Sequence, residues 1–181
     1  GLTSARHDVI NKYYKENFPE SFDNDLSDDV VYIGKHRMTD ETKVSFKGKE
    51  FKMNIGKLIL SPTRTFAPVV KNILEINFNA VNGMIHCSGG GQTKCMKYVP
   101  DNVQIVKDNL FEAPEIFKII QQSSGADDKE MYQVFNMGCR MEIYIDEKNA
   151  DQLISIAREN GIDAQVVGRV EDGNGKNLSI K

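Results

Sequence analysis

The chain has 181 residues, of which 40% are hydrophobic and 27% charged, and its formal net charge is −3. This length falls in the single-domain range, and the ordinary composition excludes wholesale disorder and collagen-like repeats. The slightly acidic balance lacks the basic footprint of a nucleic-acid-binding protein, and no apolar run is long enough to span a membrane. Three cysteines without zinc-ligand spacing are typical of reduced thiols in the cytoplasm: Cys87, Cys95 and Cys139.

Few secondary-structure elements are predicted in the N-terminal third of the chain. Apolar residues recur at helical spacing over residues 2–16, and Gly1 stands directly before them without lead-in residues. We therefore expect the chain to be an excised part of a longer protein. Residues 20–56 are polar and weakly periodic, so that only Val30–Ile33 is predicted as a strand. The acidic run at residues 23–29 lacks the glycine and glutamate of a calcium loop and predicts a solvated loop instead.

A loop around Arg64 is the first candidate for a functional segment. Proline is tolerated in the first turn of a helix, so Pro68 predicts the start of the next helix. This leaves Pro62-Thr63-Arg64 in a non-helical loop that displays a permanently charged guanidinium group. From spacing alone, an arginine that pairs with a nearby carboxylate remains the open alternative.

A run of three glycines is the second candidate. Ala80–Cys87 is predicted as a buried strand and is followed by Ser88 and then Gly89-Gly90-Gly91. Consecutive glycines after a strand indicate positive φ angles or a close approach of the backbone, and their N–H groups can form an anion-binding concavity. No Walker motif passes through this segment. His86 lies just before this turn. Two roles remain open for it, that of a ligand-binding residue and that of a purely structural residue.

The remaining elements alternate between strands and helices. They are a strand at Val103–Val106, a helix from Pro114 to Gly125, a short helix capped by Asp127 or Asp128, a strand at Arg140–Ile145, a helix at Asn149–Asn160, a strand at Ala164–Val170, and a last short strand after Gly173-Asn174-Gly175. This mixture predicts an α+β fold in which one mixed sheet is covered by helices, within a single domain at residues 1–181.

Four stretches then carry a resemblance to a known family. They are Gly1–Arg6 with its following helix, Leu60-Ser61-Pro62-Thr63-Arg64, His86-Cys87-Ser88-Gly89-Gly90-Gly91, and Glu130-Met131-Tyr132-Gln133-Val134-Phe135-Asn136-Met137-Gly138. In this order they resemble the C-terminal domain of the aminoimidazole ribonucleotide synthetase family, the phosphoribosylformylglycinamidine cyclo-ligases. The last stretch is the most specific, because related ATP-using families do not resemble it there.

The resemblance implies a partly ferredoxin-like fold and a two-domain subunit of which residues 1–181 form the C-terminal half. The N-terminal domain, absent from this chain, is then expected to carry the Mg²⁺ ligands and much of the ATP site, with no metal site here. The implied activity is ATP-dependent ring closure of formylglycinamidine ribonucleotide in purine biosynthesis, by a cytoplasmic homodimer. The isolated chain is expected to be inactive, and its partners are the nucleotide substrate, ATP and the N-terminal domain.

The resemblance also implies site residues. His86 is the expected catalytic residue, which would hydrogen-bond the amide oxygen of the substrate or relay a proton. The expected substrate- and ATP-binding residues are Thr63, Arg64, Gly89, Gly90, Gly91 and Asn136. Main-chain N–H groups and a cation suit this reaction because it develops negative charge on an oxygen and on a phosphoryl group.

Two departures from the family pattern keep other readings open. After its triple glycine the family has Glu-Asn-Leu/Ile-Pro-Arg, whereas this chain has residues 93–97, where Lys97 replaces the arginine as a point charge. Arg140 replaces the second glycine of the family's Phe-Asn-x-Gly-x-Gly-Met string. The alternatives are a related enzyme with another ATP-activated substrate, or a non-catalytic binding domain on the same scaffold.

Overall fold

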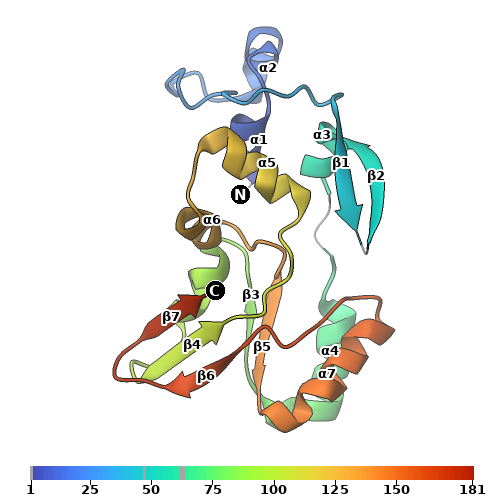
Figure 1. Ribbon diagram of the computed structural model, residues 1–181, viewed down its shortest axis with the longest axis vertical. Coiled ribbons are helices and arrows are strands. Elements are labelled where there is room, and N and C mark those ends of the chain that lie inside the picture. Colours follow the sequence, from blue (N-terminus) through green and yellow to red (C-terminus); the bar gives the residue numbers. More distant parts are fainter. Residues whose placement is uncertain (1, 47, 62–63) are drawn as a thin grey trace. The chain divides into compact units, whose positions relative to one another are not determined.

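The computed structural model describes residues 2–46, 48–61 and 64–181 (Figure 1). The chain divides into two compact units, the first made of residues 1–62 and 113–137 and the second of residues 63–112 and 138–181. Each unit has its own clusters of buried apolar residues. That residues 1–181 form a single domain stays a prediction. No helix in the described ranges has the length and apolar character needed to cross a membrane.

The first unit begins with two short helices in place of the single helix predicted over residues 2–16. Helix α1 spans Leu2–Val9 and helix α2 spans Tyr13–Asn17, followed by a 3-10 turn, η1, at Pro19–Ser21. Between the helices, Ile10 forms a parallel bridge with His36, and the Asn11 N–H donates to the His36 carbonyl at 2.9 Å. These hydrogen bonds to a distant segment take the backbone out of the helix.

The predicted strand at Val30–Ile33 is wrong. The segment forms a bend, in which Tyr32 has a φ of 52°. Val31 and Tyr32 are nevertheless fully buried, in a cluster with Ile10. The apolar run therefore correctly indicates that these side chains are buried. They are buried from a bend that contains a left-handed residue, and not from a strand.

The strands of the first unit lie further along the chain, in a hairpin that the sequence did not predict. Strand β1 spans Glu41–Phe46 and pairs antiparallel with strand β2, Lys49–Asn54. Helix α3 follows at Ile55–Ile59, and the side chain of Asn54 caps it by accepting the Lys57 N–H at 2.9 Å. The cap explains why helix α3 starts directly after strand β2.

Helices α5 and α6 complete the first unit where the sequence predicts them. Helix α5 spans Glu115–Ser124 and ends at Gly125, whose φ is 73°. Helix α6 spans Asp128–Val134 and begins with Asp127, which accepts the Glu130 N–H at 2.8 Å. Helix α1 contacts both helix α3 and helix α5, around a core formed by Ala5, Val9, Val44, Ile55, Leu58, Ile119, Ile120, Met131, Phe135 and Met137.

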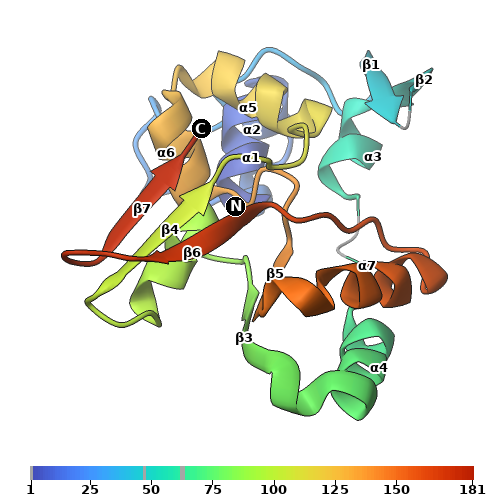
Figure 2. The same ribbon diagram turned by 60° about the horizontal axis from the view of Figure 1, so that its bottom comes forward.

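The second unit pairs two helices with a two-stranded sheet. Helix α4 spans Ala67–Asn77 with Pro68 in its first turn, and a 3-10 turn, η2, follows at Phe78–Ala80. Strand β3, Val81–His86, pairs antiparallel with strand β5, Met141–Ile145. Helix α7, Ala150–Glu159, follows a 3-10 turn, η4, at Glu147–Asn149 and lies beside helix α4 in both views (Figures 1 and 2). Their shared core includes Val69, Ile73, Leu153, Ile156 and Ala157.

The second unit also holds a three-stranded mixed sheet. Its central strand β4, Val103–Lys107, pairs antiparallel with β6, Gly168–Asp172, and parallel with β7, Asn177–Ile180. Strand β6 starts four residues later than the predicted strand at Ala164–Val170, because Asn109 takes the preceding carbonyls: its side chain bonds the Val166 oxygen and its N–H the Val167 oxygen. The α+β class is confirmed, and in the described part of the chain the strands are divided among three small sheets instead of one.

Candidate functional site

The glycine turn, defined here as residues 88–91, connects strand β3 to the 3-10 helix η3 at Gly91–Lys97. The Cys87 N–H still donates to the Arg140 carbonyl on the β5 side, at 2.8 Å, so the strand pairing continues up to the turn. The Gly91 N–H then donates to the Ser88 carbonyl at 3.0 Å, and the Thr93 N–H to the Gly90 carbonyl at 3.0 Å. The turn is therefore anchored at both ends.

Backbone conformation favours glycine at two of the three glycine positions of the turn. Gly90 has a φ of 93° and Gly91 a φ of 49°, values that favour glycine. A Cβ atom on Gly89 would meet nothing within 4 Å. Within the described residues, the N–H groups of Gly89 and Gly90 donate no hydrogen bond. Two adjacent N–H groups without an acceptor in the described chain are suited to an anionic ligand.

His86 is exposed at the end of strand β3. Its ring makes an edge contact with Phe66, with the ring centroids 5.9 Å apart. A structural histidine would be enclosed by apolar side chains, and the exposure of His86 does not match that description. The imidazole is instead free to meet a ligand beside the glycine turn.

Lys94 adds a positive charge that the sequence analysis noted only as a departure from a family pattern. Its ammonium group donates to the His86 carbonyl at 3.0 Å and to the Ser88 hydroxyl at 2.8 Å. The side chain thus folds back from helix η3 across the turn. The spacing itself was the available signal, since a lysine three residues after a glycine turn is one 3-10 turn away from it.

The other predicted site residues are not gathered at the turn. Thr63 lies outside the described residues. Arg64 is exposed, and within the described chain its guanidinium group has no hydrogen-bond or ion-pair partner. Asn136 is half-buried and belongs to the first unit, whereas His86 and the glycine turn belong to the second. The structure therefore brings together His86 and the three glycines, which are neighbours in the chain.

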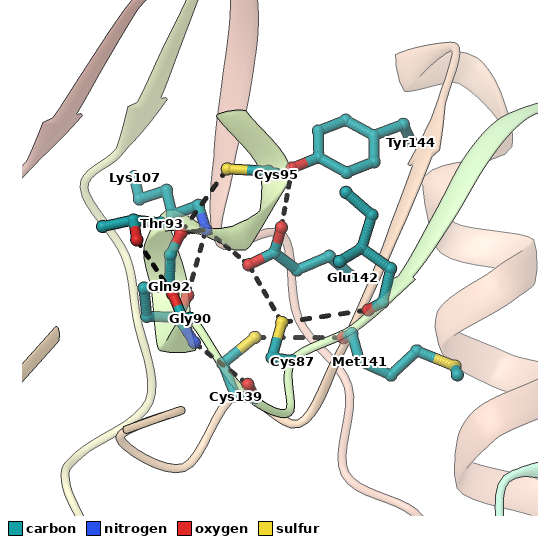
Figure 3. A network of polar contacts seen from close by, with 11 residues as sticks. Cys87, Gly90, Gln92, Thr93, Cys95, Lys107, Cys139, Met141, Glu142 and Tyr144 are labelled. Atoms are coloured by element: carbon teal, nitrogen blue, oxygen red, sulfur yellow. Dashed lines mark hydrogen bonds and ion pairs between the residues drawn. The ribbon is translucent and has the colours of Figure 1, made fainter. Parts of the chain in front are cut away.

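A buried polar network lies next to the glycine turn, and the sequence analysis missed it (Figure 3). Lys107, at the end of strand β4, is 2% exposed and forms an ion pair with Glu142 of strand β5, which is 5% exposed. Lys107 also donates to the main-chain oxygen and the side-chain oxygen of Gln92, at 2.7 and 3.1 Å. Gln92 is the residue directly after the turn, so the network reaches the site.

The three cysteines are free and buried around this network. A hydrogen bond to Cys139, together with burial, raises the pKa of the Cys87 thiol, and the same hydrogen bond lowers the pKa of Cys139. Burial and the neighbouring Glu142 carboxylate also raise the pKa of Tyr144, so its hydroxyl stays protonated and donates to Glu142 at 2.6 Å. The network is therefore fully engaged in internal hydrogen bonds, and its groups do not face a ligand.

Carboxylates do not gather at the glycine turn. Among the residues that the structure describes, no group of three or more histidine, cysteine, aspartate or glutamate side chains is arranged to hold a metal ion. The donor set of the turn, made of N–H groups, a lysine and an imidazole, suits an anion and does not suit Mg²⁺.

Comparison with known proteins identifies related chains. Residues 43–181 match the family described as AIR synthase related protein, C-terminal domain. The chain is 38% identical over 125 residues to a phosphoribosylformylglycinamidine cyclo-ligase of Methanocaldococcus jannaschii, which covers 67% of this chain and 35% of that protein. It is 31% identical over 129 residues to the enzyme of the same name from Syntrophus aciditrophicus, covering 70% and 37%. The chain thus spans little more than a third of the length of these relatives.

Proposed function

Because this chain belongs to the family of AIR synthase related protein C-terminal domains, we propose that it is the C-terminal domain of a phosphoribosylformylglycinamidine cyclo-ligase. The reaction would be the ATP-dependent ring closure of formylglycinamidine ribonucleotide to aminoimidazole ribonucleotide. The names of the relatives support this activity. The observation that carries it on this chain is the glycine turn, where two N–H groups without acceptors lie beside Lys94 and the exposed His86.

The turn is suited to hold negatively charged oxygen atoms. The N–H groups of Gly89 and Gly90 would donate to a phosphate or to an oxygen that gains charge during the reaction. Lys94 supplies a positive charge at the same turn, where its ammonium group donates to the Ser88 hydroxyl. His86 would donate to the amide oxygen of the substrate or carry a proton, as an imidazole placed beside the reacting group can.

The residues that bind the cofactors would lie partly in this chain and partly in the rest of the protein. ATP, when bound, supplies the phosphoryl group that activates the amide oxygen, and the glycine turn suits its phosphates. The described residues do not fit Mg²⁺ because they offer no cluster of carboxylates. We place the metal ligands on an N-terminal domain that precedes this chain, and Thr63, Arg64 and Asn136 among the residues that bind the nucleotides.

The proposal extends to partners and location. The chain would work with its own N-terminal domain, in a homodimer, and the isolated chain would not turn over. Three free cysteines support a reducing compartment such as the cytoplasm.

The direct test is a turnover assay of the full-length protein that carries this chain, with ATP and formylglycinamidine ribonucleotide. Formation of aminoimidazole ribonucleotide, ADP and phosphate in equal amounts is the expected result. ADP formation with another amide-bearing substrate, but none with this one, would instead identify a related enzyme. Binding of nucleotide without any turnover would support a non-catalytic binding domain.

A matched pair of variants tests the site itself. Lys94→Ala removes the ammonium group that contacts the turn, whereas Lys97→Ala removes an exposed lysine of the same helix η3. A charge-assisted hydrogen bond is worth about 1.5–3 kcal/mol, so Lys94→Ala should weaken binding of the anionic substrate by roughly 10- to 100-fold. Lys97→Ala should change binding less than about twofold. The reverse order would move the cation of the site to Lys97.

A further inference from the structure

The position of Lys107 is unusual because a lysine is almost never fully buried without a specific partner. Its side chain lies next to a cluster of Ile85, Cys87, Cys95 and Ile105, and 2% of it is exposed. An ammonium group has three N–H bonds, and Lys107 has three acceptors: Gln92 O at 2.7 Å, Gln92 Oε1 at 3.1 Å, and the Glu142 carboxylate. Its donor capacity is therefore fully used, and two of the three bonds go to one residue.

Glu142 completes the charge balance. One of its oxygens accepts from Lys107 and from the Cys87 thiol, the latter at 3.4 Å, and the other accepts from the Tyr144 hydroxyl at 2.6 Å. Both oxygens are thus occupied, as a buried carboxylate requires. Because each partner is satisfied, the lysine and the glutamate hold one fixed geometry between strands β4 and β5.

Gln92 connects this pair to the glycine turn. It has no exposed surface, and its side-chain nitrogen donates to the Cys139 carbonyl at 3.0 Å. Its main-chain and side-chain oxygens are both held by Lys107. Since Gln92 directly follows Gly91, fixing its peptide group restricts how the turn before it can be oriented.

We infer that Lys107, supported by Glu142, is a positioning residue of the glycine turn: it fixes Gln92 and thereby orients the Gly89 and Gly90 N–H groups toward an anionic ligand. The role of the ligand rests on the proposed function, whereas the fixing of the turn does not. Stability alone does not account for the pair, because replacing a buried ion pair with apolar or neutral groups of similar size is often neutral or stabilising. Such a replacement removes the hydrogen bonds from Lys107 that fix the orientation of Gln92.

The first experiment measures the turn without any ligand. In the double variant Lys107→Met/Glu142→Gln both charges disappear together, and the new amide oxygen still accepts from Tyr144. We expect amide hydrogen exchange at Gly91 and Thr93, whose N–H groups close the turn, to accelerate at least about tenfold relative to a reference amide elsewhere in the unit. The Val70 N–H in helix α4, bonded to Phe66 O at 2.9 Å, is the internal reference and should not change.

One further variant serves as a control for stability, and another tests the same inference if the double variant does not fold. Ile105→Val lowers stability in the same cluster without touching Gln92, and it should leave the exchange at Gly91 and Thr93 unchanged. Gln92→Met keeps the ion pair and serves if the double variant does not fold. It removes the side-chain contacts to Lys107 and to the Cys139 carbonyl, and should also accelerate exchange at the two amides. Unchanged exchange in a folded double variant, or in Gln92→Met, overturns the inference.

The second experiment uses inorganic phosphate as the probe and glycine-selective ¹⁵N labelling as the readout. In the wild-type chain, phosphate should shift the Gly89 and Gly90 resonances, and the double variant should require at least about tenfold more phosphate for the same shift. An equal phosphate requirement in both proteins contradicts the positioning role. If the wild-type resonances do not move while exchange responds as expected, the anion site of the proposed function fails and the positioning of the turn stands.

Discussion

Two histidines of this chain occupy opposite environments. His7, on helix α1, is 6% exposed, and both ring nitrogens have neighbours: the Tyr32 N–H approaches Nδ1 at 3.4 Å and the Arg6 guanidinium lies 3.2 Å from Nε2. Its ring also packs edge-on against Tyr32, with centroids 4.8 Å apart. His86 is exposed at the end of a strand, beside a turn with two N–H groups that have no acceptor among the residues that the structure describes.

The difference shows which features of the surroundings distinguish a structural histidine from a ligand-binding one. His7 has every property of a structural residue, although the sequence places it in an ordinary helix. His86 also touches an aromatic ring, that of Phe66, but it is exposed at the end of strand β3, and within the described residues its ring nitrogens have no hydrogen-bond partner. Burial and the hydrogen-bond partners of the ring nitrogens separate the two roles, and variants of both residues test the distinction.

The largest effect is expected for His86→Ala in the full-length enzyme. Loss of one acid–base or hydrogen-bonding group in a site lowers kcat by roughly 10²- to 10⁴-fold. Because the side chain is exposed, Tm should stay nearly unchanged. Asn82→Ala, an exposed position on the same strand β3, is the matched control and should keep full activity. An early-melting His86→Ala variant with normal turnover would make His86 structural.

The opposite pattern is expected for His7→Ala. The substitution removes a buried ring from the contact with Tyr32, and such changes typically cost about 1–3 kcal/mol in the free energy of unfolding. Urea denaturation of the chain measures this loss. Thr3→Ala, an exposed position of the same helix α1, should change the free energy by less than about 0.5 kcal/mol. A His7→Ala variant as stable as this control would contradict the structural role.

The turn beside His86 provides an intermediate effect. Gly90→Ala places a side chain on a residue with a φ of 93°, which costs about 1–2 kcal/mol. Gly89→Ala meets open space and requires no left-handed conformation, so its stability should match the wild type. If the two substitutions destabilise the chain equally, the turn does not hold the conformation described for it.

The smallest effect concerns pH. Burial, followed by the charge of Arg6, lowers the pKa of His7 below its ordinary value of 6.5. The unfolded chain therefore binds a proton at His7 more tightly than the folded chain does, and stability is lost as pH falls through about 6.5 toward the lower folded-state pKa. The free energy of unfolding, measured between pH 7.5 and 5.5, should fall more steeply in the wild type than in His7→Gln. Parallel slopes would contradict this assignment.

Local signals explain which elements were predictable. Pro68 and Gly161 mark the start of helix α4 and the end of helix α7, and Asp127 caps helix α6, since each of these residues acts on its immediate neighbours. The β1–β2 hairpin was missed because its strands are mostly exposed and rich in charged residues, with Val44 as the one residue of strand β1 that is buried. Hydrophobic alternation cannot reveal a strand that buries so little.

The candidate site also has one part that the sequence reveals and another that it does not. His86 and the glycines are contiguous, so their pattern is visible in the chain. Gln92, Lys107 and Glu142 are separated by 15 and 35 residues and resemble ordinary surface residues in sequence. Their meeting depends on the pairing of strands that lie far apart in the chain, and tertiary structure alone creates it.

The β1–β2 hairpin also affects how the protein behaves at high concentration. In the described chain its sheet contains two strands, so each strand has one edge whose N–H and carbonyl groups face no neighbouring strand. Such edges can recruit a strand from another molecule and begin aggregation. The charged residues of the hairpin oppose this association: Glu41, Lys43, Lys49, Glu50 and Lys52. The polar character that hid the hairpin in the sequence is thus what keeps its open edges from joining those of another copy.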